Sequence, residues 1–241
     1  MRVLVTRPEP AASRTAAELK RRGHEPLLLP LTVAEHDSVA LSKALSRPHS
    51  AIAITSAEAM RALAALRDTP ASLFDMPCFA VGETTAHAAW KAGFHNTVAG
   101  DNDGTVLARL IAERIGKTIS PERPVLYLAG SPRAAGFEAE LAARTIPFEV
   151  CECYRMRPFK PSLSQMEQAL GTGPVDAVLL YSSESARHVF ECTVLDADPS
   201  RFASTRFLCL SEKIVDVVPE PFRSQAEAAA VPTEASLLSL L

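Results

Sequence analysis

The sequence of 241 residues lacks the signals of several common protein classes. It has only 10 glycines, and it contains neither the Gly-x-Gly-x-x-Gly fingerprint of dinucleotide sites nor the Gly-x-x-x-x-Gly-Lys-Ser/Thr loop of ATP sites. No apolar run approaches the roughly 20 residues that a membrane-spanning helix needs. The stretch 1–8 turns polar too early for a signal peptide, so we expect a cytoplasmic protein without a membrane span.

Neither sign of charge is in large excess. The 25 Lys and Arg residues nearly balance the 28 Asp and Glu residues, which gives a formal net charge of −3. Because no cluster of basic residues stands out, we expect no surface that binds nucleic acid. The apolar fraction of 47 % excludes a disordered chain and suits a globular protein with a core of its own.

The five cysteines are an odd number, which fits a reducing compartment. Only Cys151 and Cys153 are close neighbours, and we expect a strand there to point their thiols to opposite faces, so that they share no metal ion. The six histidines show no paired ligand spacing. The sequence therefore predicts no metal site.

Short β-branched runs alternate with helical runs along the chain. Strands are expected at 2–6, 26–31, 51–55 and 78–81, and helices at 10–22, from 56 onward, at 84–92 and at 105–115. In the last of these helices, Val106, Leu107, Leu110 and Ile111 are expected on one face. Alternation of this kind predicts an α/β protein with helices on both faces of a parallel sheet.

The second half of the chain repeats the first. A shift of 122 positions aligns 3–4 with 125–126, and a shift of 126 aligns 51–58 with 177–184. A third match, at a shift of 130, follows in the same order. Ordered matches with a slowly growing offset indicate a duplicated unit of about 120 residues, the size of a flavodoxin-like domain.

Small hydroxyl residues and glycines follow the ends of the expected strands. They form short turns at 6–8, 55–58, 82–85, 130–133, 181–184 and 211–212. In a parallel sheet these strand ends form the ligand crevice, and the N–H groups of the following helices attract carboxylates or phosphates. Helix capping alone accounts for any single turn, but six such turns favour a shared cleft that binds anions.

Three single side chains add to this pattern. Arg7 and Arg133 each follow an expected first strand of a unit, where an arginine either binds an anion or lies in solvent. Tyr154 ends an alternating apolar run, just before prolines at 158 and 161 that suggest a linker. A tyrosine at a domain junction can offer its hydroxyl to a ligand, although packing as an interfacial aromatic is the more common role.

Taken together, these segments resemble the uroporphyrinogen-III synthase family. The matching pieces lie in family order at 3–8, 54–63, 80–86, 93–94, 125–130 with Arg133, 154–155, 176–183 and 232–238. The resemblance implies an α/β fold of two flavodoxin-like parallel-sheet domains, joined by a two-stranded linker with a cleft between them. It implies a discontinuous first domain of residues 1–34 plus 158–241 and a second domain of residues 36–156.

The resemblance also implies a reaction, that of a cyclising lyase in heme biosynthesis. Hydroxymethylbilane, a linear tetrapyrrole, loses water and closes into uroporphyrinogen III, and its terminal pyrrole ring is inverted through a spiro intermediate. No metal and no other cofactor is implied. Because the substrate cyclises unaided to the wrong isomer, the main task of the protein is to hold a geometry. A monomer is expected, with hydroxymethylbilane synthase as a transient contact.

The same resemblance assigns roles to residues in the matching motifs. Tyr154 is the expected catalytic residue, which assists departure of the hydroxyl or steadies the cation that follows. The expected substrate-binding residues are Ser56, Thr84, Thr85, Ser182, Ser183 and, from its place after the first strand, Arg7. The turn at 210–213 departs from the Gly and Thr-Thr-Ala pattern that the chain keeps at 82–86, which leaves contacts from that turn open.

Two other functions fit part of the pattern. A non-catalytic, two-lobed binding protein for an anionic small molecule would show the same duplication and the same turns. The position of Tyr154 and the lack of an export signal and of a DNA-binding helix pair count against it. A flavodoxin-like electron carrier is less favoured, because the chain has no obvious phosphate loop and only one tryptophan and three tyrosines.

Overall fold

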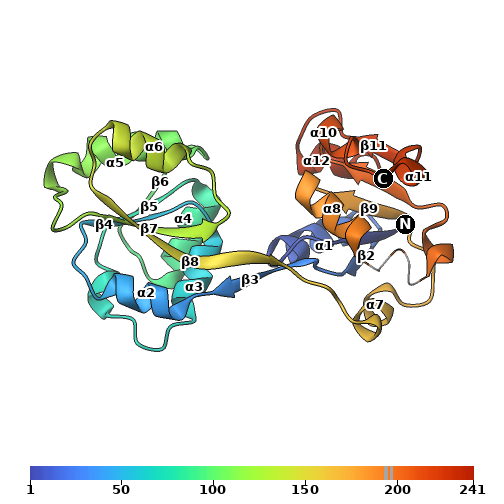
Figure 1. The fold of residues 1–241 in the computed structure, drawn as a ribbon, viewed down its shortest axis with the longest axis horizontal. Coiled ribbons are helices and arrows are strands. Elements are labelled where there is room, and N and C mark those ends of the chain that lie inside the picture. The colour runs from blue at the N-terminus through green and yellow to red at the C-terminus, as the bar shows by residue number, and fades with distance from the viewer. Residues whose placement is uncertain (193–194, 196–197) are drawn as a thin grey trace. The chain divides into compact units, whose positions relative to one another are not determined.

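The computed structural model describes residues 1–192, 195 and 198–241, and its backbone is drawn in Figure 1. Contacts between Cα atoms divide the chain into two compact units. Unit 1 comprises Met1–Val33 and Arg157–Leu241, and unit 2 comprises Ala34–Met156. The assignment of two domains, 1–34 plus 158–241 and 36–156, stays a prediction, because compactness does not show that each part folds as a domain of its own.

Unit 1 holds a five-stranded sheet in which all strand pairs are parallel. In spatial order its strands are β11 (Ala226–Ala228), β10 (Arg206–Cys209), β9 (Ala177–Leu180), β1 (Arg2–Val5) and β2 (Glu25–Leu28). Numbered by their order along the chain, the strands run 2-1-3-4-5 from β2, which is the flavodoxin-like arrangement. The α/β class with parallel sheets, expected from the sequence, is confirmed.

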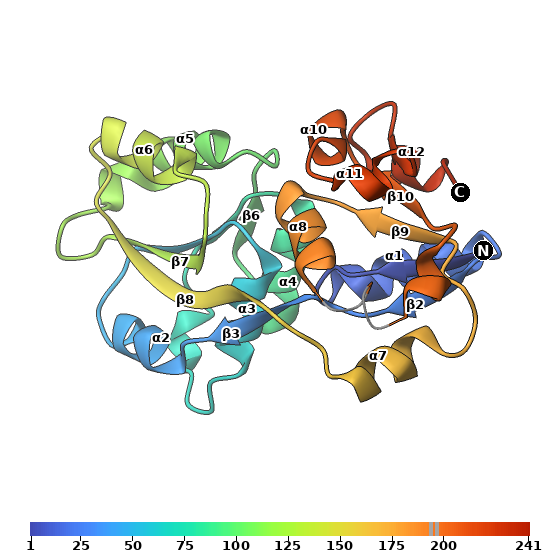
Figure 2. The same cartoon turned by 45° about the vertical axis from the view of Figure 1, so that its right-hand side comes forward.

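Helices cover both faces of the unit 1 sheet. They are α1 (Ala11–Arg21), α7 (Leu163–Leu170), α8 (Ser183–Glu191), α10 (Glu212–Val215), α11 (Glu220–Arg223), α12 (Glu234–Leu238) and the 3₁₀ turn Pro199–Phe202. Along β1 the side chains alternate, so that Leu4 packs with α7 and α8, whereas Val3 and Val5 pack with α1 and α12. Figure 2 shows α7 alongside β2. Burying each such aliphatic side chain contributes roughly 1.5–3 kcal/mol.

A six-stranded sheet forms the centre of unit 2. Its order is β3 (Thr32–His36), β8 (Phe148–Pro158), β7 (Val125–Ser131), β4 (Ala51–Ile54), β5 (Cys78–Ala80) and β6 (Thr97–Ala99). The pairs from β8 to β6 are all parallel. The chain passes between the two units within β3 and within β8, where the backbone N–H of Asp37 donates to the carbonyl of Cys153 over 2.9 Å.

The unit 2 sheet is also covered on both faces. Its helices are α2 (Ser38–Leu45), α3 (Ala57–Ala64), α4 (Glu83–Ala92), α5 (Gly104–Ile115) and α6 (Gly136–Ala143), with 3₁₀ turns at Ala71–Leu73 and Gly116–Thr118. One core lies under α2, α3 and α4, and the other under α5 and α6, as the two sides of the sheet in Figure 1 show. Helix α4 ends at Gly93, whose φ of +114° suits a residue without a side chain.

On the apolar face of α5, Leu107 and Ile111 fill the core, whereas Val106 is 38 % exposed at its border. One expectation about side-chain direction is wrong. Cys151 and Cys153 do not point to opposite faces, because both pack in the core under α2 and α3. Residues two apart in a strand share a face.

The pairing of strands supports the internal repeat. Val3 pairs with Ala177 in unit 1, and Val125 pairs with Ala51 in unit 2. These are the residues that the shifts of 122 and 126 positions align. The order β11-β10-β9-β1-β2 of unit 1 also matches β6-β5-β4-β7-β8 of unit 2. Both sheets therefore use the same arrangement with a different starting point along the chain.

Candidate active site

In each sheet the strand order reverses between two neighbouring strands near the centre, and the helices that follow these two strands go to opposite faces. In unit 1 these strands are β1 and β9, followed by α1 and α8, which lie in separate cores. In unit 2 they are β7 and β4, followed by α6 and α3. Ligands of open α/β sheets bind outside the carboxyl ends of the strands at such a switch point. The polar residues at these two places are therefore the first candidates for a site.

Tyr154 lies on β8 at the carboxyl edge of the unit 2 sheet, opposite Gly130 of β7. Its ring packs against the core under α3 and is partly buried. Burial raises the pKa of the Tyr154 phenol, and a hydrogen bond from the Ser56 hydroxyl opposes this rise without cancelling it. Tyr154 is therefore a neutral phenol at pH 7, a group that can donate a proton or a hydrogen bond.

Ser56 is the N-cap of α3, and its side chain accepts a hydrogen bond from the backbone N–H of Glu58 over 3.2 Å. The capping role expected of such a turn is therefore present. The neighbouring Thr55 hydroxyl lies 2.8 Å from the hydroxyl of Tyr127, a tyrosine on β7 that is only 1 % exposed. This pair links β7 to the turn between β4 and α3.

Glu58 lies in the first turn of α3 with only 8 % of its surface exposed. Its carboxylate is 2.7 Å from Nε2 of His36 and accepts a hydrogen bond from Nε of Arg61 over 2.8 Å. Burial raises the pKa of Glu58, but the hydrogen bonds from Arg61 and His36 outweigh it and hold this pKa below its usual range. A charged carboxylate thus ties β3 to α3 close to Tyr154. No sequence pattern identified His36 and Arg61 as partners of Glu58.

Thr84 and Thr85 follow β5, the strand beside β4. Thr85 is buried, and its N–H donates to the carbonyl of Gly82, whereas Thr84 is exposed at the start of α4. Gly82 is the N-cap of α4, and no side chain caps this helix. Because the N–H of Thr85 is taken by Gly82, the N–H groups of Glu83 and Thr84 are the ones in this first turn that can bind an anionic ligand, whereas Ser56 caps the first turn of α3.

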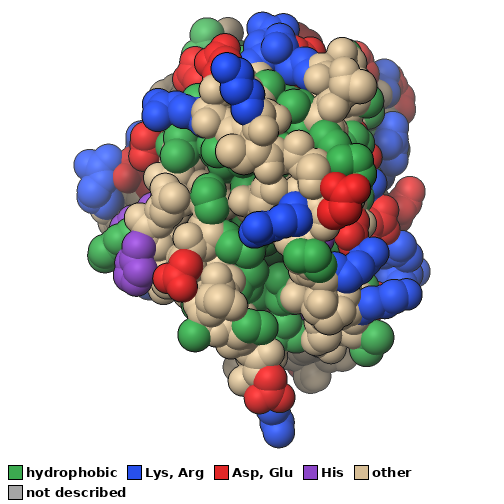
Figure 3. Space-filling model, turned by 90° about the vertical axis from the view of Figure 1, so that its left-hand side faces the viewer, with side chains coloured by type: hydrophobic (Ala, Val, Ile, Leu, Met, Phe, Trp, Pro, Cys, Tyr) green, Lys and Arg blue, Asp and Glu red, His purple; other side chains and the backbone are tan. Residues whose placement is uncertain are grey.

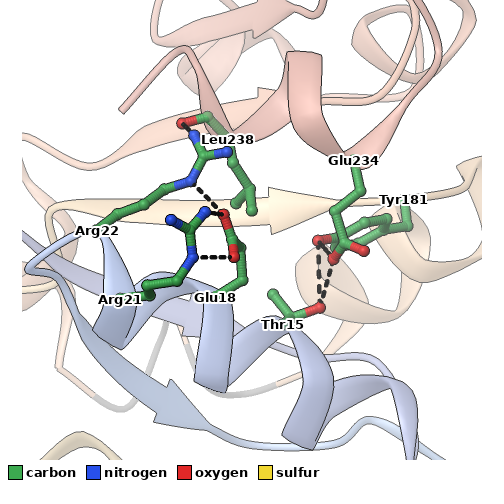
Figure 4. Close-up of polar contacts among 7 residues, drawn as sticks. All are labelled: Thr15, Glu18, Arg21, Arg22, Tyr181, Glu234 and Leu238. Carbon is green, nitrogen blue, oxygen red and sulfur yellow. Dashed lines mark hydrogen bonds and ion pairs between the residues drawn. The ribbon is translucent and has the colours of Figure 1, made fainter.

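Unit 1 carries a second polar cluster outside β1 and β9 (Figure 4). One carboxylate oxygen of Glu234 accepts hydrogen bonds from Thr15 over 2.5 Å and from the Tyr181 hydroxyl over 2.7 Å. Arg7 donates to the same oxygen over 2.9 Å, and its guanidinium carbon lies 3.9 Å from the centre of the Tyr181 ring. Burial raises the pKa of Tyr181 strongly, so its hydroxyl keeps its proton.

This cluster changes the interpretation of Arg7. The sequence offered Arg7 as a free cation for an anion, whereas the structure pairs it with Glu234, which lies 227 residues away. Sequence reasoning did not identify Glu234, although 232–238 is one of the segments that carry the family resemblance. Arg133 is also paired, with Glu138 over 2.5 Å and with Glu152 over 2.6 Å. These contacts leave only part of each guanidinium for a ligand.

The two serines after β9 have distinct places. Ser182 is the N-cap of α8 and accepts a hydrogen bond from the N–H of Ser185 over 3.0 Å, while Ser183 is the first residue of the helix. Ser211 begins α10 without a side-chain cap. In unit 2 the structure thus places Tyr154, Ser56, Thr84 and Thr85 along one edge of the sheet. Arg7, Ser182 and Ser183 lie along the corresponding edge of unit 1.

Three further findings concern metal sites, membrane spans and surface charge. Among 1–192, 195 and 198–241, no three His, Cys, Asp or Glu side chains gather as a metal site would require. The same residues form no helix long and apolar enough to cross a bilayer. On the face that Figure 3 shows, basic and acidic side chains are interspersed, without a continuous patch of either sign.

Comparison with known proteins decides the family. The family model described as "Uroporphyrinogen-III synthase HemD" matches residues 13–239. The chain belongs to the uroporphyrinogen-III synthase family. Proteins of this family are enzymes of heme biosynthesis, which act on a tetrapyrrole. No curated protein sequence matches the chain.

Solved structures of uroporphyrinogen-III synthases share the fold. The enzyme from Helicobacter pylori superposes with a TM-score of 0.62 at 17 % identity, covering 99 % of this chain and 96 % of that one. A mutant of the Thermus thermophilus enzyme gives a TM-score of 0.52 at 18 % identity, with the same coverage. At such low identity the likeness extends to the fold alone. The roles of Tyr154 and of the expected substrate-binding residues stay predictions.

Proposed function

We propose that this chain is a cyclising lyase that converts hydroxymethylbilane into uroporphyrinogen III and water. Membership of the uroporphyrinogen-III synthase family supports this reaction. The observation that assigns the reaction to a particular group is the phenol of Tyr154. This phenol is partly buried, neutral and close to Ser56, next to the switch point of unit 2. A non-catalytic binding protein is not favoured by the comparisons.

Tyr154 acts first, at the hydroxymethyl group of the substrate. The phenol of Tyr154, which burial keeps neutral, can donate to the leaving hydroxyl. Departure of that hydroxyl as water becomes easier when it receives a hydrogen bond or a proton. The C–O bond breaks with its electron pair going to oxygen, this oxygen takes the phenol proton of Tyr154 and leaves as water, and the nitrogen lone pair of the ring stabilises the resulting azafulvene cation.

The protein then directs the ring closure. The substituted carbon of the terminal pyrrole attacks the cation and forms a spiro intermediate, which fragments and closes again with that ring inverted. Loss of a proton to the Tyr154 phenolate restores the aromatic pyrrole and the phenol, so that the only products are the macrocycle and water. We assign the holding of the carboxylate arms to the open N–H groups at the start of α4 and to the hydroxyls of Ser56, Thr84 and Thr85. From unit 1, Arg7, Ser182 and Ser183 are assigned the same role.

The setting of the reaction is also part of the proposal. We place the enzyme in the cytoplasm as a monomer, without a metal or organic cofactor, and with hydroxymethylbilane synthase as a transient partner that supplies the unstable substrate. Sedimentation of the purified chain at one mass over a range of concentrations would support the monomer. A concentration-dependent rise to twice that mass would contradict it.

An isomer assay tests the reaction itself. Freshly made hydroxymethylbilane is added to the purified chain, and the oxidised products are separated into type I and type III isomers. We expect the type III isomer, with an enzyme-free sample giving type I. Because a binding protein would leave the spontaneous product unchanged, type I alone in the presence of the chain would refute the proposed function.

A further inference from the structure

The pairing of β7 with β8 contains an irregularity beside Tyr154. Ala129 pairs with Glu152, but the next residue, Gly130, pairs with Tyr154, so that Cys153 is an extra residue in β8. Such a β-bulge changes the direction of the side chains that follow it. Bulges of this kind are common next to active sites.

The bulge determines which face Tyr154 occupies. Phe148 and Val150 pack in the core under α5 and α6, and regular alternation along β8 would place residue 154 on that same face. Instead, Cys153 and Tyr154 both pack in the core under α3, although they are consecutive residues. The extra residue therefore turns the phenol toward α3, the helix that Ser56 caps.

Gly130 provides the space for the ring. A Cβ atom added at Gly130 would lie less than 3.0 Å from the hydroxyl and from two ring carbons of Tyr154, closer than real Cβ atoms approach other atoms. The backbone of Gly130 is itself buried in the sheet and has no freedom to withdraw. Any side chain at this position would force the Tyr154 ring away from its place beside Ser56.

We propose that Gly130, together with the extra residue Cys153, is a positioning device for the hydroxyl of Tyr154. Gly130 touches no substrate atom and acts only through the tyrosine. The expected effect on turnover rests on the proposed function, because it requires that the phenol of Tyr154 be catalytic. Its geometric part stands without that function.

The main test is a double-mutant cycle measured in kcat. Gly130→Ala is expected to lower kcat at least about tenfold with a smaller change in KM, since displacement of a catalytic group by about 1 Å costs up to about 10²-fold. In the Tyr154→Phe background the same substitution should change kcat less than about twofold, because the hydroxyl it displaces is gone. Equal losses in both backgrounds would overturn the proposal.

A matched control and a second measurement separate this inference from the proposed function. Gly136→Ala introduces the same methyl group where the nearest atom, Oγ1 of Thr105, lies 3.4 Å away, so it should leave kcat unchanged. Thermal unfolding then tests the geometry without any activity. Gly130→Ala should lower Tm in the wild-type background and much less in the Tyr154→Val background, where the ring is absent.

Each outcome of the thermal experiment decides the geometric part. If Gly130→Ala alone fails to fold while Gly130→Ala with Tyr154→Val folds, the clash with the ring is established. If Gly130→Ala prevents folding in both backgrounds, or lowers Tm by the same amount in both, Gly130 does not act through Tyr154. A chain without any synthase activity that still shows the thermal coupling would refute the proposed function and leave the packing of Gly130 against Tyr154 intact.

Discussion

Replacing Tyr154 by phenylalanine removes a single oxygen atom and separates catalysis from stability. The phenol is partly buried, and a hydrogen bond with Ser56 lowers its pKa. Loss of one such bond costs about 0.5–1.5 kcal/mol of stability. In a protein of this size that is a fall in Tm of about 1–6 °C. The Tyr154→Phe chain should therefore fold normally.

The expected loss of activity is larger. Removing a group that donates a proton or hydrogen bond in the transition state lowers turnover about 10²–10⁴-fold. At 1.36 kcal/mol for each tenfold step, this range corresponds to about 2.7–5.4 kcal/mol. The catalytic effect should thus exceed the effect on stability, although both follow from the same atom.

Tyr127→Phe is the matched control for this prediction. It also removes one phenol oxygen, from a tyrosine on the adjacent strand whose hydroxyl lies 2.8 Å from that of Thr55. Because Tyr127 is only 1 % exposed, we expect a loss of Tm at least as large as that of Tyr154→Phe, with turnover within about threefold of wild type. Steady-state formation of the type III isomer, measured beside thermal unfolding, compares the two variants. Wild-type turnover in Tyr154→Phe would refute the assigned role.

Three further predictions concern stability. Since the pKa of Glu58 is lowered in the folded chain, the contribution of its carboxylate to the free energy of unfolding should be complete above about pH 4.5 and be lost as the pH falls through the lowered pKa. Glu58→Gln should therefore reduce the free energy of unfolding in urea by about 1–3 kcal/mol at pH 7 and by less at pH 3.5. An equal reduction at both pH values would contradict this. Glu234→Gln should lower stability by about 1–3 kcal/mol in urea unfolding at pH 7, because three donors share one of its oxygens, and a change below about 0.3 kcal/mol would show that the cluster is not coupled. Glu227→Gln, at an exposed ion pair with Arg206, should change stability by less than about 1 kcal/mol, and a larger loss would contradict the ranking of the three sites.

Several strands and helices of this fold could be predicted from local patterns. Four consecutive apolar residues at Ala51–Ile54 form a strand that is buried on both faces, and Gly93 ends a helix through its positive φ. The order of strands in the first unit required the family resemblance, because β1 pairs with β9 across more than 170 residues of chain. No local pattern encodes such a pairing.

The site was predictable only in part, and for a physical reason. Tyr154 was identified through its motif, but its direction depends on an extra residue in β8 and on the absence of a side chain at Gly130 in the neighbouring strand. The pairing of Arg7 with Glu234 likewise depends on tertiary structure. Contacts of this kind arise from packing between distant segments, and periodicity along the chain carries no information about them.

The most direct test of the account compares the isomers formed by the wild-type chain and by Tyr154→Phe from the same fresh hydroxymethylbilane. The account predicts type III from the wild-type chain, and from the variant a mixture in which type I predominates, because the variant forms type III about 10²–10⁴-fold more slowly. Type I from both chains would contradict the assignment to this reaction. Equally fast formation of type III by both would leave the reaction in place and remove Tyr154 from its centre.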